Sequence, residues 1–79
     1  VVINVKNTAL VKALGSRIRE LRLQQDMSQE ALANEADIPL SQIGRIERGE
    51  NNPTISSLYV IAQALNVDLK VLVDFKLKK

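Results

Sequence analysis

The stretch MSQEALANEADIPLSQIGRIERG, residues 27–49, decides the fold of this chain. It predicts two short helices, over about 29–36 and 39–48, with a brief turn between them. Ser28 is a good N-cap for the first of these helices because its hydroxyl can accept a free backbone N–H. Gly49 ends the second helix, since glycine adopts the left-handed conformation at no steric cost.

Small and apolar residues lie where these two helices would cross and meet a core. Ala33 is small at the expected crossing point. The apolar positions that would hold the pair against the rest of the protein are Leu32, Ala36, Ile38, Ile43 and Ile46. Two short helices joined by a turn of three or four residues, between supporting helices, are typical of a helix-turn-helix unit. We place this unit at residues 28–48.

Upstream, a longer helix is expected over about 8–25. Its apolar residues recur at helical spacing, at Leu10, Leu14, Ile18 and Leu21. Gly15 interrupts the pattern, and a glycine inside a helix costs about 1 kcal/mol relative to alanine. The alternative is therefore a helix that begins only near Leu14.

Downstream, two further helices complete an all-α prediction. Thr54 is an expected N-cap for a helix that ends near Leu65. Its apolar stripe consists of Ile55, Leu58, Ile61, Ala62 and Leu65. Asp68 can cap a short fifth helix over about 69–73.

The two ends of the chain alternate with a period of two, as strands do. Ile3 and Val5 do so at the N-terminus, and Val73, Phe75 and Leu77 at the C-terminus. These segments are either short β segments or frayed tails, because a lone pair of strands is marginal in water. The expected divisions are an N-terminal arm at 1–7, a helix-turn-helix domain at 8–73, and a basic tail or strand at 74–79.

Composition excludes several classes of function. The 79 residues contain no histidine and no cysteine, which removes the commonest general base, thiol nucleophiles, disulfides and the usual zinc ligands. No nucleophile–base pair or metal set is discernible, so neither an enzyme nor a cofactor is expected. Tyr59 and Phe75 are the only aromatic residues, too few for a base-stacking platform. No apolar stretch approaches membrane-spanning length, and cytoplasm is the expected location.

The net charge of +2 hides a strong segregation of charge along the chain. Residues 1–25 carry five Lys or Arg against one Glu, and residues 70–79 carry four Lys against one Asp. Between them, residues 26–37 carry four acidic residues and no basic one. Such segregation can give a small protein a basic and an acidic face, although ordinary solvated helix faces are the alternative explanation.

The run from Leu14 to Val67 resembles the Cro and phage-repressor (XRE-type) helix-turn-helix family and covers about two thirds of the chain. The blocks that carry the resemblance are RIRELR at 17–22, MSQEALA at 27–33, GRIERGENNPT at 44–54 and IAQALNV at 61–67. The resemblance implies a compact five-helix, lambda-repressor-like fold. It also implies that helix 39–48 lies in the major groove of double-stranded DNA.

Residues expected to contact DNA bases follow from this placement of helix 39–48. They are Leu40, Ser41, Gly44 and Arg45, which share the face opposite the apolar one. Arg45 matches a base-contacting position of the family and can bridge guanine O6 and N7. Ser41 can pair with several base edges, and Leu40 can meet a thymine methyl. The alternative for Arg45 is a contact with phosphate alone.

A second set of residues is expected to hold the DNA backbone. They are Ser28, Gln29, Arg48, Asn51 and Asn52. Gln29 matches the phosphate-binding glutamine at the start of the family's second helix, where free N–H groups assist. A plain solvated glutamine is the alternative there. Asn51 and Asn52 are explained equally well as turn formers.

Two further residues, Arg22 and Glu47, match a partly buried ion pair of the family that fixes the tilt of the recognition helix. The chain departs from the family pattern in the turn, where Asp37 replaces a glycine. Pro39 and Leu40 replace polar residues at the start of the recognition helix. Direct hydrogen bonding to bases is therefore reduced, and specificity is expected to depend on Arg45, Ser41 and DNA shape.

The expected function is that of a sequence-specific transcriptional regulator of the repressor type, which binds double-stranded DNA as a homodimer. Two half-sites about 34 Å apart would multiply the few contacts of one small module. The alternative is a protein-interaction module, such as an antitoxin-like partner that covers a second small protein and binds DNA secondarily. The apolar termini favour that alternative, whereas nothing favours a membrane partner.

Overall fold

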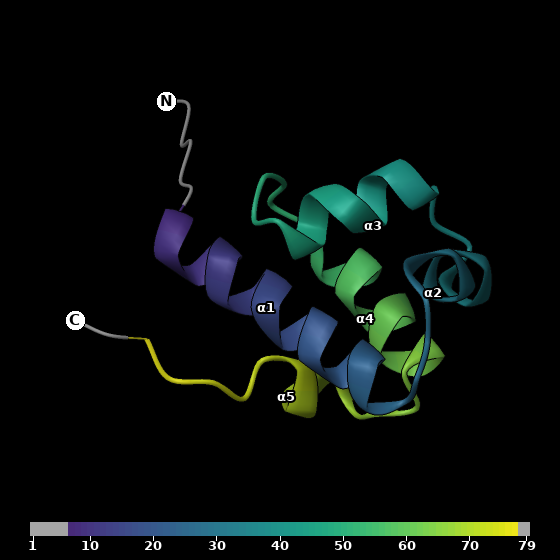
Figure 1. Ribbon diagram of the computed structural model, residues 1–79. Coiled ribbons are helices and arrows are strands. Elements are labelled where there is room, and N and C mark those ends of the chain that lie inside the picture. Colours follow the sequence, from purple (N-terminus) through teal and green to yellow (C-terminus); the bar gives the residue numbers. More distant parts are fainter. Residues whose placement is uncertain (1–6, 78–79) are drawn as a thin grey trace.

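The computed structural model describes residues 7–77, which form five α-helices (Figure 1). The helices are α1 (Thr8–Gln24), α2 (Gln29–Ala36), α3 (Leu40–Glu47), α4 (Ile55–Ala64) and α5 (Leu69–Leu72). The all-α five-helix prediction is confirmed. Within residues 7–77, no helix has the length and apolar character needed to cross a membrane.

Side-chain caps start three of the helices where the sequence predicts a start, or close to it. The side chains of Asn7, Ser28 and Thr54 accept backbone N–H groups of the first turns of α1, α2 and α4 at 3.0–3.1 Å. Each bond satisfies a donor that has no partner within its helix. Asp68 stands at the expected N-cap of α5, but its side chain makes no capping hydrogen bond.

The turn between α2 and α3 has a left-handed conformation at Asp37, the residue that replaces the family's glycine. This residue has φ 56° and ψ 46°, and its N–H donates to the carbonyls of Ala33 and Asn34. The same positive φ occurs at Asp26, Asn66 and Gly49. Aspartate and asparagine are the side chains that tolerate this region best after glycine. The turn therefore closes without a glycine, and α3 crosses α2 directly after it.

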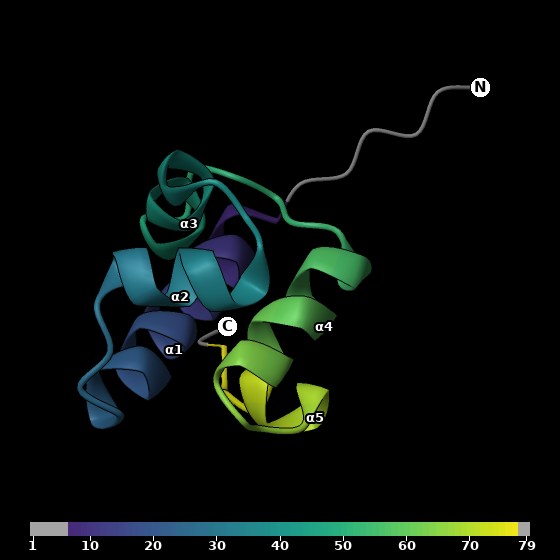
Figure 2. The same cartoon turned by 90° about the vertical axis from the view of Figure 1, so that its right-hand side faces the viewer.

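The helices enclose one core, with α1 packed on α3 and α5, and α2 packed on α3 and α4 (Figures 1 and 2). The buried apolar residues of this core are Leu14, Ile18, Leu21, Leu32, Ala33, Ala36, Ile43, Ile46, Leu58, Ile61, Ala62, Leu65 and Leu72. The predicted core is confirmed, apart from one residue in each of the apolar stripes expected on α1 and α4. Leu10 is 42% exposed and Ile55 is 65% exposed, because each lies in the first turn of its helix beyond the edge of the core.

Gly15 allows α1 and α3 to approach each other backbone to backbone. A Cβ built at Gly15 would collide with the carbonyl oxygen of Ile46 and would lie 2.7 Å from that of Glu47. The helix runs through this glycine from Thr8 and does not begin near Leu14. The local cost of glycine is thus offset by the close contact that only glycine permits.

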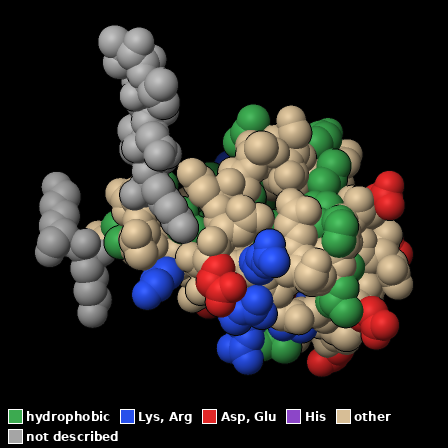
Figure 3. Space-filling model, turned by 90° about the horizontal axis from the view of Figure 1, so that it is seen from above, with side chains coloured by type: hydrophobic (Ala, Val, Ile, Leu, Met, Phe, Trp, Pro, Cys, Tyr) green, Lys and Arg blue, Asp and Glu red, His purple; other side chains and the backbone are tan. Residues whose placement is uncertain are grey.

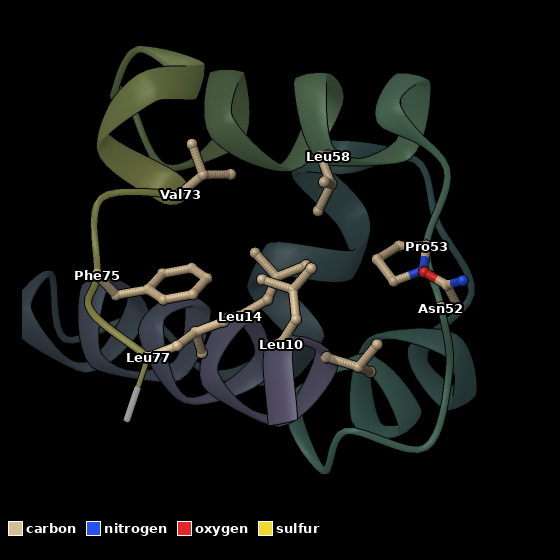
Figure 4. A pocket seen from close by; sticks show the side chains of 9 residues that line it. Leu10, Leu14, Asn52, Pro53, Leu58, Val73, Phe75 and Leu77 are labelled. Carbon is tan, nitrogen blue, oxygen red and sulfur yellow. The ribbon is translucent and has the colours of Figure 1, made fainter. Parts of the chain in front are cut away.

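The C-terminal segment that follows α5 forms no strand within the described part of the chain. The alternating residues Val73, Phe75 and Leu77 instead line an apolar groove of about 310 Å³, whose other walls are α1, α4 and the loop residues Asn52 and Pro53 (Figure 4). Phe75 packs against the core there. The corresponding prediction for Ile3 and Val5 lies outside the described residues.

Candidate nucleic-acid interface

The outward face of α3 presents most of the residues expected to contact bases. Leu40, Ser41 and Arg45 are exposed, while Ile43 and Ile46 on the opposite face are buried. Pro39 stands at the N-cap position of α3 and makes no side-chain capping bond. The first N–H groups of α3 have no partners within the helix and remain able to bind acceptors.

Gly44 differs from this expectation, because the structure buries it. The guanidinium of Arg48, one turn further on, lies over it, and a Cβ at Gly44 would be 2.9 Å from Arg48 Nη1. Gly44 therefore lies on the outward side of α3 but is covered in the free protein. Sequence spacing identifies the side of a helix, whereas the position of a long neighbouring side chain depends on tertiary structure.

Arg48 is held by an ion pair with Glu50, a residue that sequence reasoning did not assign to the site. Arg48 Nε donates to Glu50 Oε2 at 2.8 Å, and both side chains are exposed. The hydrogen bond from Arg48 holds the pKa of the Glu50 carboxyl below its ordinary value. The same bond raises the pKa of Arg48. The Arg48 guanidinium, which is expected to bind phosphate, is thus paired with a carboxylate in the free protein.

The start of α2 places Ser28 and Gln29 beside the end of α3. Ser28 Oγ accepts the N–H of Ala31 at 3.0 Å, which leaves its hydroxyl hydrogen available. Gln29 is only partly exposed, because its Nε2 donates to Glu47 Oε1 at 3.1 Å. Gln29 is thus tied to the end of α3 in the free protein. In the loop after α3, Asn52 is exposed and Asn51 is half-buried.

Arg22 and Glu47 form a buried, two-pronged ion pair between α1 and α3. Arg22 Nε donates to Glu47 Oε2 at 2.7 Å, and Arg22 Nη2 donates to Glu47 Oε1 at 2.9 Å. Arg22 Nη1 donates to the carbonyl of Met27 at 2.8 Å. The side chains are 8% and 2% exposed. This arrangement links α1, the entrance of α2 and the end of α3 at one point.

On the α3 side of the molecule, most basic side chains gather apart from most of the acidic ones (Figure 3). Figure 3 looks onto this side and shows blue side chains grouped beside one red carboxylate. The other red side chains lie along the right-hand rim, where α2 is located in Figure 1. A strip of apolar side chains separates the two groups in Figure 3. The acidic side chains on this rim therefore do not cover the basic group.

Comparison with known proteins gives a direct match to a family. The helix-turn-helix family matches residues 18–72, which span the ion pair, α2, the turn and α3. The chain belongs to the helix-turn-helix family. Within this family, the motifs of the chain resemble the Cro and phage-repressor type. The five-helix fold agrees with that resemblance.

Among relatives of this helix-turn-helix protein is the control protein C.BamHI of Bacillus amyloliquefaciens. The two are 42% identical over 62 residues, which cover 77% of this chain and 76% of C.BamHI. The HTH-type transcriptional regulator SutR of Escherichia coli is 33% identical over 82% of this chain, but the match covers only 36% of SutR. The restriction-modification controller protein C.AhdI from Aeromonas hydrophila has the same fold, with a TM-score of 0.76. It is 38% identical over 80% of this chain and 94% of its own.

Proposed function

We propose that this helix-turn-helix protein is a sequence-specific regulator of transcription that binds double-stranded DNA through α3. The observation that carries the proposal is the exposed pair Ser41 and Arg45 on the outward face of α3, flanked by the start of α2 and the loop at 49–52. Arginine and serine are side chains that read base edges, and helix starts and polar loops bind phosphates. Names of relatives support the same function, since they describe control proteins and a transcriptional regulator.

In this mechanism, the backbone contacts position the protein and the α3 side chains read the sequence. Ser28, Gln29, Asn51 and Asn52 bind phosphate oxygens on either side of the major groove. Arg45 donates two hydrogen bonds to one guanine, and Leu40 packs against a thymine methyl. Gly44 lets the DNA approach α3 closely once Arg48 has moved to a phosphate. Domain 8–73 carries these contacts, with residues 1–7 and 74–79 as flanking segments.

The protein is proposed to act as a homodimer. One copy offers few base contacts, and two recognition helices about 34 Å apart would meet successive major grooves on one side of the duplex. Linking two weak binding events in this way multiplies affinity through effective concentration. DNA is the partner, and the cytoplasm is the proposed place of action. The names of C.BamHI and C.AhdI extend the proposal to control of restriction–modification genes, which sequencing of genomic fragments bound by the protein would test.

Arg45→Ala is expected to weaken binding to the preferred duplex by about 1–3 kcal/mol, or roughly 5- to 150-fold, because one two-pronged contact with guanine is lost. The preferred duplex is obtained by selection from a random library with the native protein. Fluorescence titration then measures affinity for this duplex and for a scrambled one. Binding to the scrambled duplex is expected to change far less.

Arg19→Ala is the matched control, since Arg19 is exposed on α1 and lies outside the α3 face. It is expected to leave discrimination between the two duplexes unchanged. An equal loss on both duplexes in Arg45→Ala would assign Arg45 to phosphate. Failure of the native protein to bind any duplex would refute the DNA-binding function.

Glu50→Gln is expected to strengthen binding to every duplex by about two- to fivefold at low salt, since an exposed ion pair holds Arg48 only weakly. Arg48 reaches the same phosphate in the native complex, so the slope of log K against log salt is expected to stay nearly the same, because the number of phosphate contacts is unchanged. Affinities measured at several salt concentrations provide the test. Glu20→Gln is the control, because Glu20 pairs with Arg17 at 2.7 Å on α1, so its loss frees an arginine elsewhere. Unchanged affinity at every salt concentration in Glu50→Gln would show that Arg48 does not leave Glu50 for a phosphate.

A protein-interaction module is the second candidate function, and the apolar groove favours it. Leu10, Val73 and Leu77 around this groove are large, apolar and exposed. Under that candidate, a second protein is the principal ligand and selected duplexes bind weakly. The titration with the selected duplex separates the two candidates.

A further inference from the structure

We propose that Glu47 is a positioning residue for DNA binding, which orients the amide of Gln29 toward the phosphate. This inference rests on the proposed DNA-binding function. Glu47 is one half of the buried ion pair that links α1 to the end of α3. Its contact with Gln29 gives it a second role, because the carboxylate that ties α1 to α3 also determines how the side chain at the start of α2 is presented.

The geometry leaves Gln29 one orientation that satisfies both partners. Gln29 Nε2 lies 3.1 Å from Glu47 Oε1, and the same oxygen accepts Arg22 Nη2 at 2.9 Å. A carboxylate accepts hydrogen bonds and donates none. A flipped amide would place the Gln29 carbonyl oxygen against Glu47 Oε1, so that two acceptors would face each other. Glu47 therefore holds the amide nitrogen inward and fixes the plane of the whole group.

This orientation suits a phosphate ligand. The amide nitrogen carries two hydrogens, and Glu47 takes only one of them. The second N–H is not taken by Glu47, and the first backbone N–H groups of the same helix, α2, have no partners within the helix. A phosphate oxygen is an acceptor, so it can bind the remaining N–H together with these backbone groups. A glutamine fixed in advance loses less side-chain entropy on binding than a free one.

Arg22 makes this arrangement compatible with DNA. An unpaired carboxylate would repel a phosphate bound nearby. Glu47 is hydrogen-bonded to Gln29 at the start of α2, which is where the phosphate is proposed to bind. The two hydrogen bonds from Arg22 compensate that charge at 2.7 and 2.9 Å. Burial of both side chains keeps the pair fixed, since neither has space to rotate away. Arg22, Glu47 and Gln29 thus form a chain of hydrogen bonds that runs from the buried ion pair to the partly exposed start of α2.

The test compares the effect of Gln29→Ala in two backgrounds. In the native background, Gln29→Ala is expected to weaken binding to a scrambled duplex about fivefold, the factor typical of one hydrogen bond. The second background combines Arg22→Met with Glu47→Leu, which removes both charges together and leaves neither buried alone. In that background, binding is already about fivefold weaker, and Gln29→Ala is expected to change it by less than about twofold.

Glu47→Asp supplies a second background in case the double variant does not fold. It keeps the negative charge for Arg22 but draws the carboxylate back by about one bond, or 1.5 Å. The effect of Gln29→Ala is expected to shrink there too. Gln24→Ala, an exposed glutamine near the end of α1, is the matched control and is expected to have no effect in any background.

An NMR measurement tests the positioning without any DNA. The side-chain amide protons of Gln29, assigned by their loss in Gln29→Ala, are expected to exchange slowly and to differ in shift from those of Gln24. Both features are expected to disappear in the Arg22→Met, Glu47→Leu background. An equal loss of affinity from Gln29→Ala in all backgrounds, or a Gln29 amide with the shifts of Gln24, would overturn the inference. Absence of duplex binding together with a protected Gln29 amide would refute the proposed function and leave the orientation by Glu47 intact.

Discussion

Glu47→Leu is expected to lower the free energy of unfolding by about 3–5 kcal/mol, because it leaves the buried guanidinium of Arg22 without its counter-charge. A chain of this size has a total stability of only about 4–12 kcal/mol. The variant is therefore expected to be close to unfolding at room temperature. Urea denaturation followed by circular dichroism measures the loss.

The double variant Arg22→Met with Glu47→Leu is the control for this prediction. Replacing a buried ion pair with apolar side chains of similar volume is often neutral or stabilising. We expect the second substitution to restore most of the stability that the first removes. If Glu47→Leu cost less than about 1 kcal/mol, as for a surface pair, the burial of this ion pair would be contradicted.

Gly15→Ala is expected to destabilise the fold by about 2 kcal/mol or more, although alanine is the better helix former by about 1 kcal/mol. The added methyl group would meet backbone carbonyls of Ile46 and Glu47, and backbone cannot rotate away as a side chain can. The axes of α1 and α3 would have to separate. Thermal and urea unfolding provide the measurement.

Gly44→Ala makes the same chemical change inside a helix with the opposite expected result. The nearest atom to a Cβ there is Arg48 Nη1, the end of a flexible side chain, which can move at little cost. We therefore expect Gly44→Ala to be neutral or to stabilise by up to about 1 kcal/mol. The difference between the two variants is the informative quantity, and equal effects would contradict the close approach of α1 to α3.

Local sequence signals predicted the helices well because the caps themselves are local. Ser28 and Thr54 bond to N–H groups three residues ahead, and the turn at Asp37 needs only a residue that tolerates positive φ. Apolar spacing failed at Leu10 and Ile55, since periodicity does not reveal where the core ends. The alternating C-terminal residues also match a strand, yet Val73 and Phe75 line a groove without any strand partner within residues 7–77.

The site was predicted in outline, and its internal contacts were not. Motif positions identified Gln29, Arg45 and Arg48, which the structure places at the start of α2 and on and directly after α3. The hydrogen bond from Gln29 to Glu47 and the pairing of Arg48 with Glu50 depend on how helices and long side chains come together in space. One signal for Glu50 was available, because an acidic residue two positions after an arginine in a tight loop can fold back onto it.

Two close contacts join α1 to the C-terminal end of α3 and to the residues directly after it. One is the approach at Gly15, and the other is at Gly49, where a Cβ would lie 2.9 Å from the Cα of Lys12. These contacts and the buried Arg22–Glu47 pair position α3 without involving its exposed side chains. Residues 40, 41 and 45 can in consequence be substituted together without changing the position of α3. A library of such substitutions would allow proteins with new DNA sequence preferences to be selected on the same fold.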